Sequence, residues 1–402
     1  MKVDPEGAGL DARQLAYIGE HLRTRYIEPG KITGCQVTVA RHGVVGYFEN
    51  FGLMDREADK ATADDTIYRL FSMTKPITGV ALMKLYEQGH FQLGDPVHRW
   101  IPEWKGLKVK TKDGLVEQDR PMSVKDCLMH TTGLGWGIDG DLSMDKFLPA
   151  MAALRGGEDG NLEGLTRQLA QYPLEFQPGT RWLYGMSTDI CGRLVEAMSG
   201  IQFDEFLRQE IFEPLGMVDT DFYVPEDKLG RLAVNYIRTP KKELRALEGM
   251  FAGVSTTPPR FQSGGGGLLG TSADYLRFAQ MLCNGGELDG VRILGRKTVE
   301  LMTQNHIPGG GDLGDFHVAG SYGETGFDGV GFGLTMAVGL GQVPTQSIGS
   351  VGDFYWGGAA STIFWVDPVE ELVVIFMTQL MPSGTFNFRG QLKSIVYPAI
   401  AD

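Results

Sequence analysis

Ser72 and Lys75 are the two residues whose types and spacing most directly suggest chemistry. They stand in the sequence Phe-Ser-Met-Thr-Lys-Pro, ahead of an apolar run over 77–88. Residues three apart share a helix face, so the hydroxyl and the amine should lie side by side. An amine in apolar surroundings has a lowered pKa and can accept the serine proton. The spacing therefore suggests a nucleophile with its own base.

The helix that must position this pair is predicted to begin close to Ser72. Pro76 has no backbone N–H to donate, so it has to lie in or near the first turn. Gly89 is a suitable C-terminal stop. Apolar residues occur all around the helix between them, which is typical of a buried helix. The positive end of the helix dipole would favour negative charge that develops beside Ser72.

Ser143 and Lys146 have the same spacing. A serine in this position is often a helix N-cap, with the lysine on a solvated face. The residues after Ser143 are mixed in polarity, which favours the cap interpretation there. The apolar helix after Ser72 argues against a solvated lysine. The spacing alone leaves both interpretations of Ser72 open.

A catalytic serine also needs a second proton-transfer group and backbone N–H donors for the oxyanion. Tyr184 precedes a predicted helix, and its phenol could act if the Lys75 ammonium lowered its pKa. In the sequence 356–359 two glycines would let a ligand approach the backbone, so the N–H groups of Ala359 and Ser72 could form an oxyanion hole. The alternatives are a packed aromatic side chain at Tyr184 and a glycine-bent strand end at 357–358.

Other common sites are missing or lack their context. No serine lies in Gly-x-Ser-x-Gly, and no histidine pair has the His-Glu-x-x-His spacing of a zinc hydrolase. A buried structural role is the favoured interpretation of His130. Gly265, Gly267 and Gly270 have dinucleotide-binding spacing, but a proline-rich stretch replaces the strand that should precede them. The sequence therefore predicts neither a nucleotide cofactor nor a metal.

Composition and charge narrow the class of protein. The chain has 402 residues, of which 42% are hydrophobic, enough for a sizeable core. A net charge of −13 argues against nucleic acid or anionic membrane as a partner, and is compatible with a monomer or a small homo-oligomer. No run is long enough to span a membrane, and the polar start has no signal-peptide core. The four cysteines are widely spaced, which suggests reduced packing residues in a cytoplasmic protein.

Strand patterns occur near both ends of the chain, and helical patterns lie between them. The α+β fold class follows: a mostly antiparallel sheet flanked by helices, with an inserted, mainly helical lobe. We expect the terminal helices on one face of the sheet and the helix from Ser72 on the other, against the helical lobe. Residues 1–92 and 250–402 are predicted to form the α/β domain and 93–249 the lobe, with the active site between them. The main predicted strands are 34–40, 44–50, 354–356, 361–366 and 372–380, and the main predicted helices are 11–24, 147–154, 189–198, 203–211, 272–283 and 389–400.

Three motifs, in order, resemble those of the serine β-lactamase and penicillin-binding-protein superfamily. Ser-x-x-Lys matches Ser72 and Lys75, the Tyr-x-Asn of the class C enzymes falls at 184–186, and Lys-Thr-Gly falls at 356–358. The resemblance runs from about residue 10 to the C-terminus and includes the stretches 130–134, 176–184, 267–280 and 365–379. Two positions depart from it: Met186 replaces the asparagine and Trp356 the lysine that help lactam-cleaving relatives bind the lactam side chain and carboxylate. Trp-Gly-Gly is similar to the third motif of the family VIII carboxylesterases, which are class C-like and cleave short-chain esters.

The resemblance implies a serine carboxylesterase that cleaves short-chain acyl esters through an acyl-enzyme on Ser72, without metal or cofactor. It implies Lys75 as the general base, Tyr184 as its partner, and the backbone N–H groups of Ser72 and Ala359 as oxyanion donors. The substrate would contact Trp356, Gly357, Gly358 and Met186. One rival is an acyltransferase with the same residues; others are a weak β-lactamase or D-Ala-D-Ala-type peptidase, and a catalytically dead relative that acts as a binding module. Fluorophosphonate labelling separates the last from the rest, because only a reactive serine is labelled.

Overall fold

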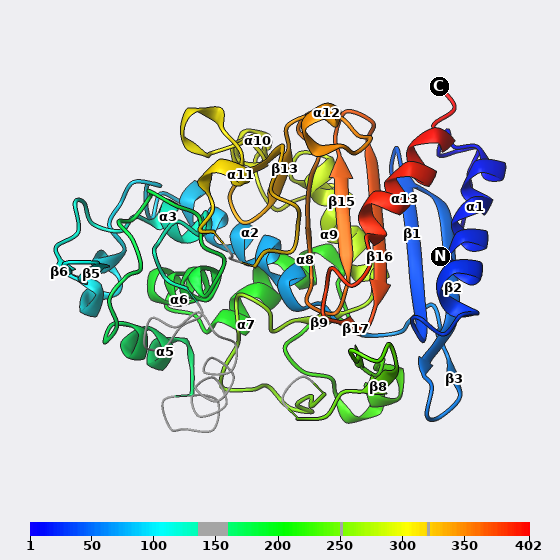
Figure 1. Cartoon of the computed structure of the whole chain (residues 1–402), viewed down its shortest axis with the longest axis horizontal. Coiled ribbons are helices and arrows are strands. Elements are labelled where there is room, and N and C mark those ends of the chain that lie inside the picture. The colour runs from blue at the N-terminus through cyan, green and yellow to red at the C-terminus, as the bar shows by residue number, and fades with distance from the viewer. Residues whose placement is uncertain (136–159, 250–251, 320–321) are drawn as a thin grey trace.

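An eight-stranded antiparallel sheet, on the right in Figure 1, is the main sheet of the described residues. The computed structural model of the chain describes residues 1–135, 160–249, 252–319 and 322–402. The sheet has the strand order β12-β13-β14-β15-β16-β1-β2-β3, so strands from the two ends of the chain meet at its centre. This arrangement confirms the predicted α+β class with a mostly antiparallel sheet. The strands are β1 Gly34–Arg41, β2 Val44–Asp55, β3 Lys60–Ala61, β12 Val330–Phe332, β13 Ala337–Gly339, β14 Phe354–Gly357, β15 Ile363–Asp367 and β16 Leu372–Thr378.

The pairing of β1 with β16 joins the distant parts of the sequence. Its register runs from Cys35 opposite Thr378 to Arg41 opposite Leu372. The Thr378 hydroxyl also donates to the Gly34 carbonyl at 2.7 Å, across 344 residues of chain. Every residue of both strands is buried. Strands that are buried along their whole length are expected where helices cover both faces of the sheet.

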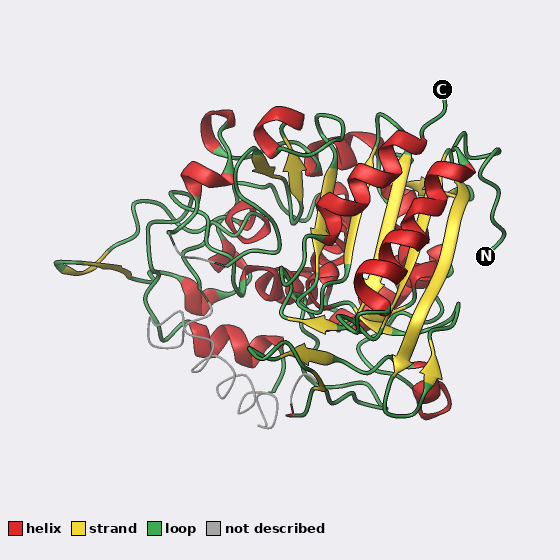
Figure 2. Cartoon of the chain, turned by 45° about the vertical axis from the view of Figure 1, so that its right-hand side comes forward, coloured by secondary structure: helices red, strands yellow, loops and turns green. Residues whose placement is uncertain are grey.

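Helices do cover both faces. On one face lie α1 (Ala12–Leu22), capped by Asp11 as predicted, and α13 (Phe388–Val396); Figure 2 shows two helices lying across the strands. On the other face α9 (Ser272–Cys283) packs against β1, β15 and β16. The sequence predicts the helix from Ser72 on this face, against the helical lobe. That helix, α2 (Thr74–Glu87), does pack against α6 (Ser187–Ser199) of the predicted lobe, whereas α9 is the helix that packs on the three strands.

The middle of the chain is mainly helical, as its periodicity indicates. Short two- and three-stranded ribbons accompany the helices. Ser143, Lys146 and the predicted helix 147–154 lie outside the described residues, and the division at residues 92 and 250 stays a prediction. The remaining described α-helices are α3 Val124–Leu128, α5 Leu162–Leu169, α7 Phe203–Leu207, α8 Glu213–Leu215, α10 Arg296–Met302, α11 Leu313–Phe316 and α12 Gln342–Thr345. The remaining strands are β4 Tyr68–Arg69, β5 Val109–Thr111, β6 Gly114–Val116, β7 Tyr236–Arg238, β8 Leu244–Ala246, β9 Leu269–Gly270, β10 Glu287–Leu288, β11 Val291–Arg292 and β17 Leu380–Met381.

Within the described ranges, no helix combines the length and the apolar character that a membrane crossing requires.

Candidate active site

Ser72 lies in a tight turn directly ahead of α2. A single 3₁₀ turn, Phe71–Met73, precedes the helix, and Phe71 adopts a φ of +46°. A bulky residue in this region is strained, and such strain persists only where the surrounding structure holds it. The Tyr275 hydroxyl of α9 helps by donating to the Met73 carbonyl at 3.0 Å. The turn leaves the Ser72 side chain 7% exposed, at the edge of an otherwise buried helix.

Lys75 is fully buried and close to the serine. Its Nζ lies 3.2 Å from Ser72 Oγ and donates to the Gly265 carbonyl at 2.6 Å. It also lies 4.6 Å from the centroid of the Tyr184 ring. Burial lowers the pKa of the Lys75 amine to about 8, against the opposing effect of the Asp189 and Glu324 carboxylates. A substantial fraction of the amine is therefore neutral near pH 8, and a neutral amine can accept a proton.

The glycine-rich stretch 264–267 delivers the carbonyl that holds Lys75. Asp189, in the first turn of α6, accepts hydrogen bonds from the Gly265 N–H at 3.2 Å and the Ser263 hydroxyl at 2.6 Å. A Cβ at position 265 would lie 2.6 Å from an Asp189 oxygen, so only glycine fits. The sequence excluded a nucleotide-binding role for these glycines but gave no sign of this one.

Tyr184 is buried against the same pair of residues. Its hydroxyl oxygen accepts a hydrogen bond from Trp356 Nε1 at 3.2 Å, and Tyr184 also hydrogen-bonds Ser72. Burial, reinforced by the Glu324 carboxylate, raises the pKa of Tyr184 well above 10. The condition under which Tyr184 could act as a base, a pKa lowered by the Lys75 ammonium, is not met, because desolvation of the phenolate is the largest effect on this pKa. Tyr184 is a neutral phenol, suited to donate a proton.

His130 packs against Tyr184 and hydrogen-bonds residues close to it in the chain. It is fully buried, and its ring centroid lies 4.9 Å from that of Tyr184. Nδ1 accepts from the Gly185 N–H at 3.4 Å, and Nε2 lies 3.2 Å from the Thr188 hydroxyl. Burial, with the nearby Lys75, lowers its pKa well below 6.5, so the imidazole is neutral. These contacts agree with the structural role that the sequence favoured.

The end of β14 reaches the segment that carries Ser72. A Cβ at Gly358 would lie 2.3 Å from the Leu70 carbonyl oxygen, so glycine allows the close approach. The Gly358 N–H is already used, since it donates to the Thr362 carbonyl at 2.8 Å. The Ala359 N–H donates to no acceptor in the part of the chain that the structure describes. This segment therefore offers one unused N–H, directly after the glycine that approaches Leu70, two residues ahead of Ser72.

A family model described as Beta-lactamase matches residues 21–394. The chain belongs to the beta-lactamase family. It is 30% identical to Esterase EstB of Burkholderia gladioli over 397 residues, 95% of each chain, and 29% identical to the lovastatin esterase of Penicillium rubens, over 91% of this chain and 94% of that one. The solved structure of EstCE1, described as a hydrolase with promiscuous acyltransferase activity, superposes with a TM-score of 0.77 at 26% identity and covers 97% of this chain and 99% of that one. The resemblance that the motifs gave is confirmed, and this member of the family is a serine hydrolase or acyltransferase.

The two departures from the lactam-cleaving members of the beta-lactamase family are both buried. Trp356 is fully buried and its indole N–H is directed to Tyr184. Met186 is 2% exposed and packs in the core at the start of α6. Gly357 is also buried, and a Cβ there would lie 3.2 Å from Arg389 Nη2. The structure therefore brings Ser72, Lys75, Tyr184 and Trp356 into one connected set and places Met186 in the core beside it.

Sequence reasoning missed a polar group next to this set. Glu324 is partly exposed, but the atoms packed around its carboxyl raise its pKa, and it hydrogen-bonds the Tyr322 and Ser383 side chains. The Tyr322 ring centroid lies 6.1 Å from that of Tyr184. Arg389, from α13, donates to the Trp356 carbonyl at 3.0 Å and to the Glu324 carbonyl at 3.4 Å. No motif contains Tyr322, Glu324, Ser383 or Arg389, so no sequence signal could have assigned them.

Within the described residues, no three His, Cys, Asp or Glu side chains gather closely enough to hold a metal ion.

Proposed function

We propose that the protein is a serine carboxylesterase that hydrolyses short-chain acyl esters through an acyl-enzyme on Ser72. The observation that carries this proposal is the buried Lys75 amine, 3.2 Å from Ser72 Oγ, with its pKa lowered to about 8. The similarity to EstB and to the lovastatin esterase supports ester cleavage. Lys75 is the general base, Tyr184 is its partner, and no metal or cofactor takes part.

Acylation uses the geometry around the serine directly. Ser72 Oγ attacks the ester carbonyl carbon, and its proton passes to the neutral Lys75 amine. The bond from Lys75 to the Gly265 carbonyl uses an N–H, which leaves the nitrogen lone pair for the serine proton. The carbonyl oxygen gains negative charge and binds to the backbone N–H groups of Ser72 and Ala359.

The tetrahedral intermediate then collapses, the ester C–O bond breaks, and the alcohol leaves with a proton. Tyr184 supplies this proton, because it is protonated and hydrogen-bonded to Ser72. The phenol recovers a proton from the Lys75 ammonium. A water molecule attacks the acyl-enzyme by the same steps in reverse, and the carboxylic acid departs.

The surroundings of the site favour a neutral substrate. A β-lactam usually carries a carboxylate, which binds best to a cation that is free to donate hydrogen bonds. Trp356 supplies only an indole, and Arg389 is occupied by two backbone carbonyls. Glu324 adds a carboxyl group rather than a cation beside Tyr184. Met186 and Trp356 are both buried, and neither supplies a charged group for a carboxylate.

The test compares ester and lactam on one preparation. A lost charge-assisted hydrogen bond together with a lost neutral one corresponds to about 2–4 kcal/mol, or roughly two to three decades in kcat/KM. We expect kcat/KM for p-nitrophenyl acetate or butyrate to exceed that for nitrocefin by at least ~10²-fold. Longer p-nitrophenyl esters, run in the same series, measure the acyl length. Comparable values for ester and lactam would replace this proposal with a β-lactamase.

Acyl transfer is a second candidate, and one observation favours it: EstCE1, which this fold matches along nearly its whole length, is a hydrolase with promiscuous acyltransferase activity. Hydrolysis and transfer share the acyl-enzyme and differ only in the acceptor. With p-nitrophenyl butyrate and increasing 1-butanol, a transferase releases butyl butyrate in place of butyric acid. A hydrolase keeps butyric acid as the main product, and we expect this result.

A further inference from the structure

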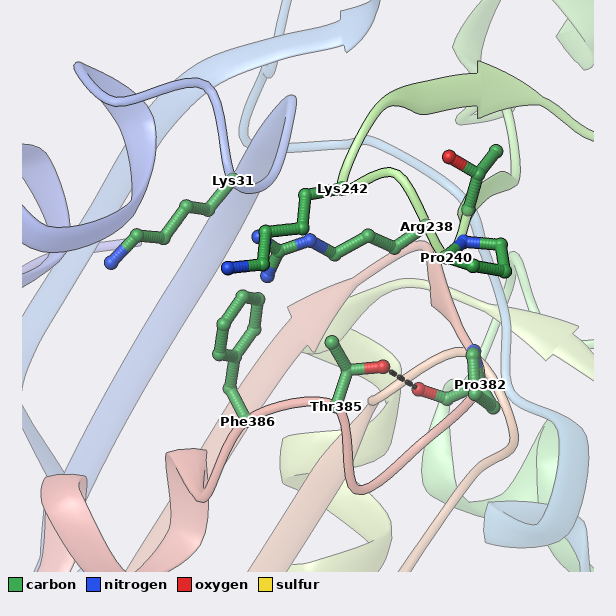
Figure 3. Close-up of a pocket in the computed structure, with 8 residues that line it drawn as sticks. Lys31, Arg238, Pro240, Lys242, Pro382, Thr385 and Phe386 are labelled. Atoms are coloured by element: carbon green, nitrogen blue, oxygen red, sulfur yellow. Dashed lines mark hydrogen bonds between the residues drawn. The ribbon is translucent and has the colours of Figure 1, made fainter.

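A groove of about 610 Å³ has a lining that includes none of Ser72, Lys75 and Tyr184 (Figure 3). Three segments form it. They are Lys31, which follows α1 in the chain, the turn between β7 and β8, and the connection from β17 to α13. Its volume is within the range of pockets that hold small organic molecules. No step of the proposed ester hydrolysis uses this groove.

The groove is positively charged although the protein is strongly acidic. Lys31, Arg238 and Lys242 line it, and Figure 3 shows the Arg238 and Lys242 side chains extending over the same part of the groove as Phe386. None of the three pairs with a carboxylate in the described ranges of the chain. Arg245, on the same hairpin, does pair with Glu243 at 2.8 Å. Two neighbouring cations without a counter-ion repel each other, and a bound anion would relieve this repulsion.

An aromatic ring lies at the centre of these charges. The Arg238 guanidinium carbon is 4.9 Å, and Lys31 Nζ 6.0 Å, from the centroid of the Phe386 ring. The ring is itself held by Tyr26, with centroids 5.1 Å apart, so it is a preformed surface. Pro240 and Pro382 extend the apolar lining. A ligand that fits has a flat apolar body as well as a negative charge.

We propose that this groove binds small organic anions, with a carboxylate or phosphate between Arg238 and Lys242 and an apolar body over Phe386. A guanidinium presents paired donors that match the oxygens of either anion. The cations of the groove attract the charged group, and the apolar ring removes the rest of the ligand from water.

Isothermal titration calorimetry of the full chain tests the proposal with four probes: 1-naphthoate, 1-naphthyl phosphate, neutral 1-naphthalenemethanol and inorganic phosphate. We expect at least one aryl anion to bind with a dissociation constant below about 1 mM. The neutral probe and inorganic phosphate should each bind at least ~10-fold more weakly. Whichever aryl anion binds more tightly identifies the acidic group that the groove accepts.

Variants locate the binding. Arg238→Gln/Lys242→Gln should weaken the aryl anion at least ~10-fold, whereas Arg245→Gln, the matched control on the same hairpin, should change it less than ~2-fold. The thermal unfolding temperatures of the variants show that they are folded, and their hydrolysis of p-nitrophenyl butyrate should equal that of the parent. The proposal is overturned if neither aryl anion binds, if the double variant binds as well as the parent, or if the neutral probe binds equally.

Discussion

Lys75 and Lys393 lie in two different regions of the molecule, and both are buried beside aromatic rings. Lys75 Nζ is 4.6 Å from the centroid of Tyr184, and Lys393 Nζ is 5.3 Å from that of Tyr355. Their partners differ. The Lys393 ammonium forms an ion pair with the buried Asp353, whereas no described carboxylate pairs with Lys75. The comparison teaches that the counter-ion separates a structural lysine from one that can act as a base.

The largest expected effect is the loss of the nucleophile itself. Ser72→Ala should lower kcat by at least ~10³-fold in a folded protein, because a whole reaction path is removed. Ser143→Ala, in the second Ser-x-x-Lys sequence, should leave kcat nearly unchanged. Steady-state kinetics with p-nitrophenyl butyrate measure both. If Ser143→Ala loses activity and Ser72→Ala keeps it, Ser143 is the nucleophile and Lys75 is not the catalytic lysine.

The next effect concerns the coupling of Lys75 to Tyr184. In the proposed mechanism Tyr184 gives its proton to the leaving alcohol and recovers one from the Lys75 ammonium, so their contributions should not be additive. The double variant Lys75→Ala/Tyr184→Phe should have a kcat/KM little below that of the poorer single variant. If the losses in kcat/KM of the two single variants multiply in the double variant, Lys75 and Tyr184 act independently, and Lys75 needs no partner.

The comparison of Lys75 with Lys393 also predicts a difference in stability between their variants. Lys393→Met leaves Asp353 as an unpaired buried charge and should lower the free energy of unfolding by about 3–5 kcal/mol. Lys75→Met removes a buried amine that has no counter-ion, so stability should be kept while activity is lost. Urea unfolding measures both. Adding Asp353→Asn to Lys393→Met should recover part of the loss, and an unchanged Lys393→Met protein would show that the ion pair does not matter.

The pH dependence of kcat/KM tests the base directly. The lowered pKa of Lys75, about 8, means that the amine is mostly protonated at pH 6 and mostly neutral at pH 9. Only the neutral form accepts the serine proton, so activity should rise with pH, by about tenfold per unit well below pH 8, and then level off. A pH profile that is flat from 6 to 9 would contradict the assignment of Lys75.

The smallest effect is expected from Glu324. Its carboxylate raises the pKa of Lys75 against the larger effect of burial, so Glu324→Gln should lower that pKa further. The rising limb of the pH profile should then move to lower pH, by up to about one unit. Glu300→Gln, on the exposed helix α10, is the control and should leave the limb in place. A shift to higher pH in Glu324→Gln would show that the two groups do not interact as inferred.

The elements that sequence predicted well are those with local signals. Pro76, Gly89 and the apolar circumference locate the buried helix after Ser72, and Asp11 marks the start of α1. The motifs then selected Tyr184 and Trp356, which the structure joins to the Ser72–Lys75 pair.

What could not be predicted depends on residues far apart in the chain. The bond between Lys75 and Gly265 spans 190 residues, and the contact between Trp356 and Tyr184 spans 172. The position of α9 on one face of the sheet depends on packing, for which a single helix gives no signal. The direction in which the pKa of Tyr184 shifts could not be predicted, because burial and Glu324 act on it only in the folded protein.

The pairing of β1 with β16 also has a consequence for synthesis. The hairpin of β1 and β2 can form as soon as it leaves the ribosome, but the strand that pairs with its other edge follows 344 residues later. At usual rates of translation this delay is roughly 15–70 s. During that time an apolar strand edge remains open to other nascent chains. The growing chain should therefore depend on chaperones mainly for this one edge, and only until its partner strand is made.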